Sequence, residues 1–225
     1  MSQYSPAPAR LKFIVVDDHE LVLDGTINVL RRQYPEAEIL TAQTAYIAIE
    51  QVEKAKPNLI VMDLSIPEKL GESAKTDTGI QLLRTLLKNY PYLNLMVQST
   101  YIKALVRIIP DIDAHKGGFT IADKSLCSKE MLNQVDWALQ GLSQTKDIKA
   151  VQTGLEIKPE WLTVLNLAFE AGLQDKAIAA RMCVSERMVR HYWTKVQDVL
   201  GIYPEAGKNI RIQTEIRAKE EGLID

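Results

Sequence analysis

The sequence predicts an α/β domain built on a parallel sheet, followed by a smaller all-α domain. From Leu11 to about Gln140, short β-branched runs alternate with longer segments of helical period, which is the pattern of parallel strands joined by helices. After Lys158 the strand signals stop and only helical patterns remain. The 225 residues are enough for two modest domains, each with its own hydrophobic core.

Five strands and five helices are expected in the first domain. The apolar runs place strands at residues 11–16, 37–41, 58–63, 93–99 and 118–122. The remaining segments place helices at 20–33, 44–55, 79–89, 102–109 and 128–140. Pro35, Pro57 and Pro91 each fall just before a strand, where proline ends the preceding segment. Five such units indicate a flavodoxin-like, doubly wound sheet of five parallel strands.

The second domain is expected to consist of helices alone. Residues 141–157 lose the periodicity and are interpreted as a linker, so the predicted domains cover residues 1–140 and 158–225. The helical patterns of the second domain cover residues 159–171, 175–182, 186–200 and 209–221.

Composition excludes several classes of protein. With a net charge of −2, 46% hydrophobic and 25% charged residues, the chain is neither disordered nor basic overall. It has no apolar stretch near about 18 residues and its polar start is unlike a signal peptide, so no membrane partner is expected. Cys127 and Cys183 lack metal-like spacing, which favours reduced thiols and a cytoplasmic protein.

The most informative polar residues each follow a predicted strand. Asp17 and Asp18 follow the run FIVV, and Asp63 follows LIVM. Ser99 follows LMVQ, and Lys124 follows the stretch GGFTIAD. Because the carboxyl ends of parallel strands open onto one edge of the sheet, three carboxylates, one hydroxyl and one ammonium should converge there.

These residue types match the needs of a phosphorylatable carboxylate. An aspartate can accept a phosphoryl group as an acyl phosphate, and a Mg²⁺ ion held by carboxylates offsets the charge of the incoming anion. A lysine and a hydroxyl then bind the remaining phosphoryl oxygens. Polar residues also cap strand ends without such a role, but five suitable residues in this order favour a phosphorylation site.

With the motifs IVVDDHE, LIVMDLSIP and ADKS, residues 11–140 resemble the receiver domain of two-component response regulators. The resemblance implies that a sensor histidine kinase phosphorylates Asp63. It also implies that Ser99 is the switch residue and that Lys124 binds the phosphoryl group. The Mg²⁺ site that it implies has direct ligands from the carboxylates of Asp18 and Asp63 and the backbone carbonyl of Ser65, and Asp17 holds the ion through water.

Two features depart from the family pattern, and Tyr101 leaves a further alternative open. The glycine expected soon after the LSIP motif is delayed to Gly79, an insertion of about eight residues that is either a solvated loop or a lid or partner contact. The aromatic switch position falls either on Phe119, across a bulge, or on Ile121. Tyr101 either covers the acyl phosphate and slows its hydrolysis, or lies exposed at the start of a helix.

The pattern of residues 171–201 is typical of a helix-turn-helix. Ala179 is small where two helices approach closely, and Cys183 and Val184 form the turn. Ser185 is a suitable N-cap for the second helix, and Val189 should lie on its buried face. Residues 176–195 hold five basic residues and one acidic residue, so positive charge is concentrated here.

The outer face of the second helix is expected to contact double-stranded DNA. Arginine can read guanine edges, and lysine or histidine can hold phosphates. A generic basic surface helix is the simpler alternative. The predicted DNA-binding residues are Lys176, Ser185, Arg187, Arg190, His191, Thr194 and Lys195.

Residues 160–225 are similar to the LuxR-type output domain of NarL/FixJ response regulators. The similarity rests on Ala171-Gly172, Lys176, Ile178, Ala179, Met182, Val184-Ser185, Val189-Arg190 and Val196. The last helix resembles the one that packs two output domains together on DNA, which implies a homodimer in the active state. The Arg-Glu pair of the family's opening motif is missing, Tyr192 replaces the motif histidine, and YPEAGKN is inserted before the last helix.

We therefore expect a DNA-binding response regulator that is switched by phosphorylation of Asp63. One alternative is a signalling adaptor whose helical domain binds a protein, since 10 basic and 11 acidic residues follow from Leu155 onward. Another is a regulator that acts without phosphorylation. A dedicated enzyme is not expected, because the only chemistry of the site is gaining and losing its own phosphoryl group.

Overall fold

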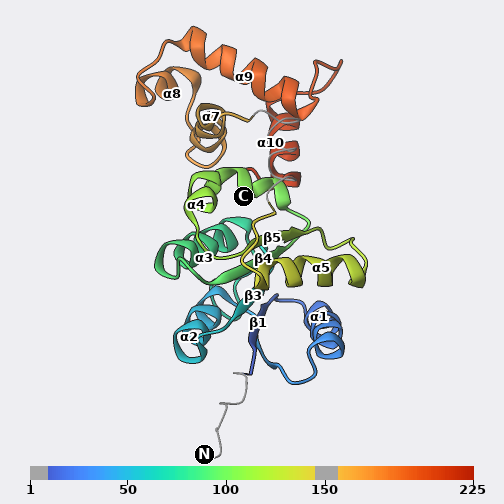
Figure 1. The fold of residues 1–225 in the computed structure, drawn as a ribbon. Coiled ribbons are helices and arrows are strands. Elements are labelled where there is room, and N and C mark those ends of the chain that lie inside the picture. Colours follow the sequence, from blue (N-terminus) through green and yellow to red (C-terminus); the bar gives the residue numbers. More distant parts are fainter. Residues whose placement is uncertain (1–9, 145–156) are drawn as a thin grey trace, which may run out of the picture. The chain divides into compact units, whose positions relative to one another are not determined.

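The computed structural model describes residues 10–144 and 157–225 (Figure 1). The chain divides into two compact units. The first contains the residues up to Thr100 together with Asp111–Gln144, and the second contains Tyr101–Pro110 together with residues 157–225. Among the described residues, none of the helices is both long enough and apolar enough to cross a membrane.

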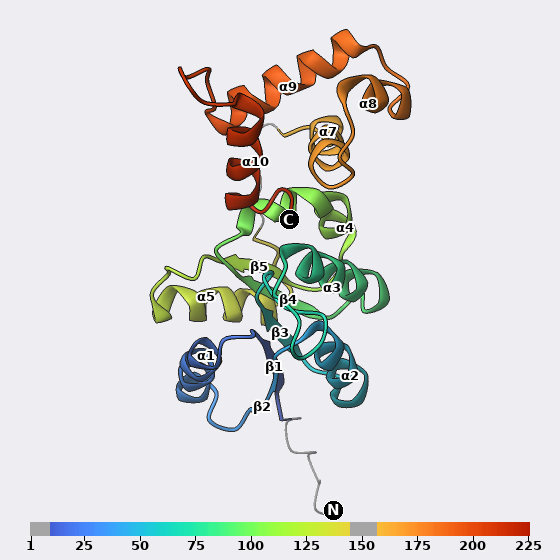
Figure 2. The same cartoon turned by 180° about the vertical axis from the view of Figure 1, so that it is seen from behind.

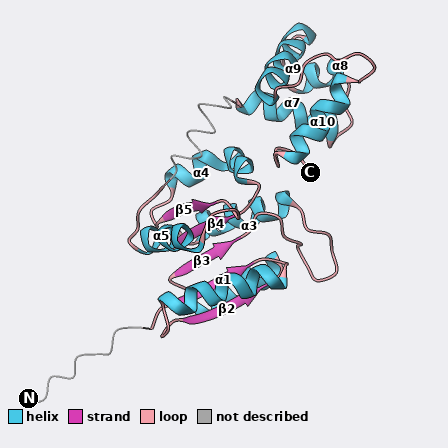
Figure 3. Cartoon of the chain, turned by 90° about the vertical axis from the view of Figure 1, so that its right-hand side faces the viewer, coloured by secondary structure: helices cyan, strands magenta, loops and turns pink. Residues whose placement is uncertain are grey.

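A five-stranded parallel sheet forms the centre of the first unit, as predicted (Figure 3). The strand order β2-β1-β3-β4-β5 is that of flavodoxin-like folds. The strands are β1 Lys12–Val16, β2 Glu38–Ala42, β3 Leu59–Met62, β4 Asn94–Gln98 and β5 Phe119–Ala122. All four residues of β3 are buried, because helices cover both faces of the sheet.

Two helices cover each face of this sheet (Figures 1 and 2). Helices α1, Glu20–Gln33, and α5, Ser128–Leu139, lie on one face. Helices α2, Ala45–Ala55, and α3, Thr76–Asn89, lie on the other. Side chains alternate between the faces along each strand, and Phe13 and Val15 of β1 join the core under α1 and α5.

The helix predicted at residues 102–109 is wrong in type and extent. Ile102–Ile108 form a 3₁₀ segment, η1, and Ile109–Ala114 form a short helix, α4. Pro110 explains the division, because proline has no N–H to donate to the carbonyl four residues earlier, yet it is tolerated in the first turn of a helix. Helix α3 also begins three residues before the predicted start at Gly79.

The first residues of the predicted linker are tied to the sheet. Phe119 donates its backbone N–H to the carbonyl of Leu142, and Gln144 donates to the carbonyl of Phe119, at 3.1 and 2.8 Å. Ser143 thereby forms a parallel bridge with β5. The rest of the predicted linker, residues 145–156, lies outside the described residues.

Four helices build most of the second unit, at the predicted places. They are α7 Pro159–Phe169, α8 Asp175–Arg181, α9 Glu186–Leu200 and α10 Ile210–Glu220. Trp161, Ile178 and Trp193 belong to their common core, which the buried residues Leu223 and Ile224 complete.

The 3₁₀ segment η1 also belongs to this second unit. Lys103 forms an ion pair with Glu221, next to the end of α10. Tyr101 lies against Gly222, where an added Cβ would be 3.2 Å from the tyrosine ring. Gly222 also has a φ of +67°, which a residue with a side chain rarely adopts. Tyr101 is therefore half-buried beside Gly222, and the predicted shielding of an acyl phosphate by this ring stays a prediction.

Candidate functional site

The ends of three strands fix the backbone of the predicted phosphorylation site. The N–H of Asp17 donates to the last residue of β2, Ala42, at 3.1 Å. The N–H of Asp63 donates to the last residue of β1, Val16, at 2.9 Å. Ser99 is held in the same way by the last residue of β5, at 3.1 Å. The ladder of the parallel sheet thus continues one residue past each strand and brings the polar side chains to one edge.

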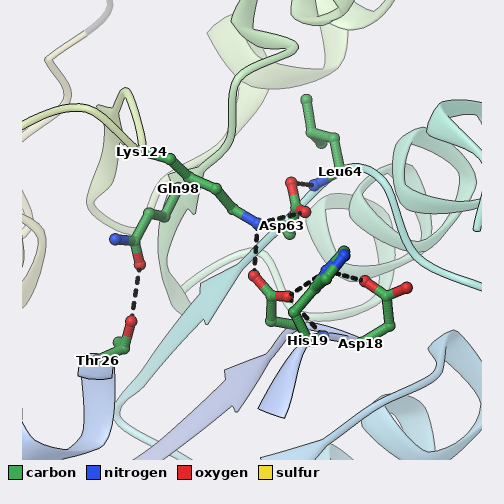
Figure 4. Close-up of polar contacts among 8 residues, drawn as sticks. Asp18, His19, Thr26, Asp63, Leu64, Gln98 and Lys124 are labelled. Atoms are coloured by element: carbon green, nitrogen blue, oxygen red, sulfur yellow. Dashed lines mark hydrogen bonds and ion pairs between the residues drawn. The ribbon is translucent and has the colours of Figure 1, made fainter. Parts of the chain in front are cut away.

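Lys124 joins two of the aspartates at this edge (Figure 4). Its Nζ donates to Asp17 Oδ2 at 2.6 Å and to Asp63 Oδ2 at 2.7 Å. Both carboxylate side chains are 4% exposed and the lysine side chain is 19% exposed. These three residues are separated by up to 107 positions in the chain, so the sheet, and not local sequence, brings them together.

The ammonium group of Lys124 is held in its charged form by the two carboxylates. Burial alone would lower the pKa of Lys124, but its hydrogen bonds and charge interactions with Asp17 and Asp63 outweigh burial and raise the pKa above its usual value. The site therefore keeps one fixed positive charge among its carboxylates.

His19 is a member of the site that the sequence prediction missed. Its Nδ1 lies 2.9 Å from Asp18 Oδ1 and 3.3 Å from Asp17 Oδ1, and its backbone N–H donates to the same Asp17 oxygen at 2.9 Å. The three residues together offer a set of atoms that could hold a metal ion. The one sequence signal for His19 was its position directly after Asp17-Asp18. Its ring is 66% exposed and belongs to no hydrophobic pattern, so periodicity did not reveal it.

The donor set at this edge suits a hard divalent cation. Carboxylate oxygens of Asp17 and Asp18 lie together, and the buried Oδ1 of Asp18 has no hydrogen-bond partner among the described residues, only the ion-pair contact with His19. Mg²⁺ prefers oxygen ligands of this kind. Asp63 lies close by through the shared contact with Lys124, and Ser65 is half-buried two residues further along the chain.

The loop after Asp63 is held tightly at both ends. The Asp63 carboxylate accepts the N–H of Leu64 at 2.6 Å. Ile66 and Lys75 form an antiparallel bridge, so the inserted residues leave and return at one point. A Cβ on Gly79 would lie 1.9 Å from the carbonyl oxygen of Leu64. Gly79, the delayed glycine, therefore lies where a side chain would clash with the backbone of Leu64, and residues 68–75 of the insertion are exposed.

Strand β5 has no bulge near Lys124. Phe119–Ala122 pair one-to-one with Leu95–Gln98 of β4. The alternative that places the aromatic switch position on Phe119 needed a bulge, so the regular strand favours Ile121. Ser99, the predicted switch residue, is fully buried at the end of β4.

The helix-turn-helix of the second unit has the predicted geometry. Ala179 of α8 and Val189 of α9 are both buried. The turn passes through Cys183, whose φ is +55°. Ser185 caps α9 by accepting the N–H of Met188 at 3.2 Å.

The predicted DNA-binding side chains lie mainly on the solvent side of these helices. Lys176, Arg187, Arg190, His191 and Thr194 are exposed. Lys195 is half-buried and lies 3.9 Å from Asp198 on the same helix. The second helix therefore combines a buried apolar face with an exposed face that carries two arginines.

Comparisons with known proteins agree with this architecture. Residues 13–114 match the response regulator receiver domain, as the motifs of this region predicted. The transcriptional regulatory protein YdfI of Bacillus subtilis is 26% identical over 223 residues, which cover 95% of this chain and 97% of YdfI. The DNA-binding transcriptional activator DevR/DosR of Mycobacterium tuberculosis is 26% identical over 208 residues, which cover 85% of this chain and 89% of DevR/DosR.

A solved structure resembles this chain over most of its length. RcsB from Salmonella enterica serovar Typhimurium, bound to a promoter, has a TM-score of 0.62 and 18% identity, and the match covers 94% of this chain and 99% of that one. At this identity the likeness describes the fold. The predicted fold class, a five-stranded receiver followed by a helical output region, is confirmed.

Proposed function

We propose that this chain is a transcriptional response regulator that binds DNA and is switched by phosphorylation of Asp63. The observation that carries the proposal is the buried contact of Lys124 with Asp17 and Asp63, at 2.6 and 2.7 Å, at the carboxyl edge of the sheet. Such a cation can hold an added phosphoryl group in place. We assign the receiver to residues 1–140, the linker to 141–157 and the output domain to 158–225.

Asp63 is the nucleophile of the proposed phosphoryl transfer. The N–P bond of a phosphohistidine breaks as phosphorus bonds to a carboxylate oxygen of Asp63. The electron pair of the broken bond stays on the histidine ring, which takes up a proton. When bound by Asp17, Asp18, Asp63 and the carbonyl of Ser65, Mg²⁺ supplies charge neutralisation for this step. Lys124 holds the phosphoryl oxygens of the product.

A sensor histidine kinase is the proposed donor. Leu21, in the first turn of α1 and three residues past the acidic pair, is 87% exposed. An exposed apolar side chain beside a charged reaction site suits contact with a protein surface. The kinase phosphohistidine would then reach Asp63 along the open edge of the sheet.

Ser99 and the segment after it carry the signal away from Asp63. Phosphorylation adds negative charge at the sheet edge, towards which the buried hydroxyl of Ser99 turns. Two residues later begins the segment Tyr101–Pro110, which groups with the helical unit. A small movement at Ser99 would therefore be passed directly to the contacts of η1 with the end of α10.

In the active state we propose a homodimer on DNA. Ile212 and Ile216 of α10 are 55% and 54% exposed and lie four residues apart on one helical face. A self-complementary apolar stripe of this kind suits a two-fold interface. Each protomer would then read one half-site with α9. This binding would take place in the cytoplasm.

Labelling with acetyl phosphate tests the phosphorylation step. In the presence of Mg²⁺ the wild-type protein should gain one phosphoryl group, and Asp63→Asn should gain none. Ser125→Ala, next to the site lysine, should label like the wild type and serves as the control. A label that persists in Asp63→Asn would remove Asp63 from its proposed role.

A protein-binding adaptor is the competing function for the helical unit. The balance of 10 basic and 11 acidic residues from Leu155 onward favours it over a strongly basic DNA-binding surface. A mobility shift with genomic fragments separates the two functions. Binding that weakens steeply with added salt indicates DNA contacts, and no shift at low salt indicates the adaptor.

A further inference from the structure

Three side chains from three different helices meet in the helical unit. Arg211, at the start of α10, places its guanidinium 3.6 Å from the ring centre of Trp193 in α9. The same guanidinium donates from Nη2 to both carboxylate oxygens of Asp175 in α8, at 3.1 and 3.0 Å. Trp193 Nε1 also donates to Asp175 Oδ1, at 3.1 Å. We call Asp175, Trp193 and Arg211 the interhelical clamp.

The chemistry of the clamp gives it a defined geometry. The planar guanidinium stacks over the indole ring while its N–H groups point at the Asp175 carboxylate. A lysine ammonium has no such plane and cannot fix both contacts at once. Burial lowers the pKa of Arg211, and its contacts with Asp175 oppose that shift. Trp193 is 3% exposed, so its N–H depends on Asp175 for a partner away from water. Each of the three side chains thus contacts the other two, through hydrogen bonds to Asp175 and through stacking of Arg211 on Trp193.

The clamp lies between the two surfaces that the proposed function uses. On α9, Trp193 is on the buried face, three residues after Arg190 and directly before the exposed Thr194. On α10, Arg211 directly precedes Ile212, the first residue of the exposed apolar stripe. Asp175 begins α8 and stands next to the exposed Lys176. The clamp therefore joins α9, which we call the reading helix because it is proposed to contact the half-site, to α10, which we call the dimer helix because it is proposed to form the two-fold interface.

We propose that Arg211 is a positioning residue that fixes α9 relative to α10 and so sets the distance between the two half-sites that a dimer reads. This inference rests on the proposed function. In a two-fold dimer built on α10, the angle between α10 and α9 determines how far apart the two reading helices lie. Because the clamp fixes the geometry of its three side chains, it would restrict the angle between α10 and α9 and so select one half-site spacing.

A clamp that only stabilises the fold would behave differently. Its loss would lower the fraction of folded protein and weaken binding to every DNA in proportion. Its loss would leave the preferred spacing unchanged, because the surviving folded molecules would keep the wild-type angle. The distribution of spacings is therefore the readout that separates positioning from stabilisation.

Selection from random-sequence duplex DNA tests the inference with the full-length, acetyl-phosphate-treated protein. The variants are Arg211→Met, which keeps a side chain of similar length, and Arg211→Lys, which keeps the charge without the planar group. Arg217→Met is the matched control, since Arg217 lies on the same helix and pairs with Glu220 and Glu221. Thermal unfolding of each variant is measured beside the selection.

The wild type and Arg217→Met should enrich paired half-sites with one spacing. Arg211→Met should enrich the same half-site sequence with several spacings and bind the wild-type pair about tenfold more weakly, as expected from losing a half-buried, stacked ion pair. Arg211→Lys should fall between them. If Arg211→Met does not fold, Arg211→Lys and Trp193→Phe, which keeps a smaller aromatic ring and removes the N–H, decide the question.

Two results would overturn the inference. One is a single, wild-type spacing in every folded clamp variant, which would make the clamp a stabiliser only. The other is enrichment of no DNA by the wild type, which would overturn the proposed function and this inference with it. The first result leaves the proposed function standing, so the two failures are distinguishable.

Discussion

Lys124 places a positive charge between two buried carboxylates, and this contact makes the edge of the sheet both the proposed phosphoryl site and a weak point of the fold. Removing one partner of a buried ion pair leaves the other charges uncompensated. With side chains only 4% exposed, Asp17 and Asp63 cannot rely on water instead. A bound divalent cation is the group that could best replace the Lys124 ammonium as a positive charge beside Asp17 and Asp63.

Lys124→Gln should therefore destabilise the metal-free protein by about 3 kcal/mol at neutral pH. Addition of excess Mg²⁺ should recover part of that loss, because the cation replaces the missing charge. Urea unfolding with and without Mg²⁺ measures both effects, with Lys129→Gln on the exposed side of α5 as the control. Equal destabilisation in the two conditions would contradict a shared charge role for Lys124 and the cation.

On the reading helix, arginine and lysine should have different effects when they are removed. Arg190→Ala should cost about 1–3 kcal/mol of discrimination between DNA sequences, because an exposed arginine there can reach base edges. Lys195→Ala should weaken binding to all sequences alike, since a lysine contacts phosphates without reading bases. Competition binding with specific and unrelated duplexes checks both, and unchanged preference in Arg190→Ala would place the reading surface elsewhere.

The sequence correctly predicted the positions of residues that a strand pattern marks. Asp17, Asp63 and Ser99 each end an apolar strand, and parallel pairing fixes where such ends meet. His19 was missed because an exposed ring next to two acids carries no periodicity. Arg211 was missed for a different reason, since its partners Trp193 and Asp175 are distant in sequence and only the packing of three helices joins them.

At the scale of elements, the strands and most helices followed from hydrophobic period alone. The β-branched runs of β1 and β3 are buried on both faces of the sheet, and such positions accept few polar residues. The failure at residues 102–109 has a local cause in Pro110, which divides the segment into η1 and α4. Helix α3 was predicted too short because its first turn, TDT, lacks the apolar residues that mark the rest.

Gly79 shows how one element depends on close approach. Its missing Cβ lets α3 lie against the backbone of Leu64, directly after Asp63, the proposed phosphoacceptor. Gly79→Ala should destabilise the protein by about 3 kcal/mol or more, because a backbone carbonyl at 1.9 Å has to move. It should also slow labelling by acetyl phosphate, since the displaced loop carries Ser65.

Gly25→Ala is the matched control for that change. Gly25 lies in α1, where an added Cβ would meet nothing within 4 Å. The substitution should stabilise the protein by about 0.5–1 kcal/mol through the higher helix propensity of alanine. Chemical unfolding of both variants decides the matter, and a Gly79→Ala protein as stable as the wild type would refute the close-approach argument.

In the whole molecule, the chain itself connects the proposed phosphorylation site to α9, the proposed DNA-reading helix. Segment Tyr101–Pro110 begins two residues after Ser99 and groups with the helical unit, where Lys103 pairs with Glu221. The clamp and the exposed stripe of α10 then connect that region to the reading helix and to a second protomer. Phosphorylation at one end and DNA binding at the other are therefore linked in the proposed regulator.

Salt-dependent DNA binding by the phosphorylated protein tests this central claim most directly. The wild type treated with acetyl phosphate and Mg²⁺ should bind its selected duplex at least about tenfold more tightly than untreated protein, with an affinity that falls steeply as salt rises. Asp63→Asn should show no change on the same treatment. Equal affinity of treated and untreated wild type, despite complete labelling of Asp63, would contradict the account.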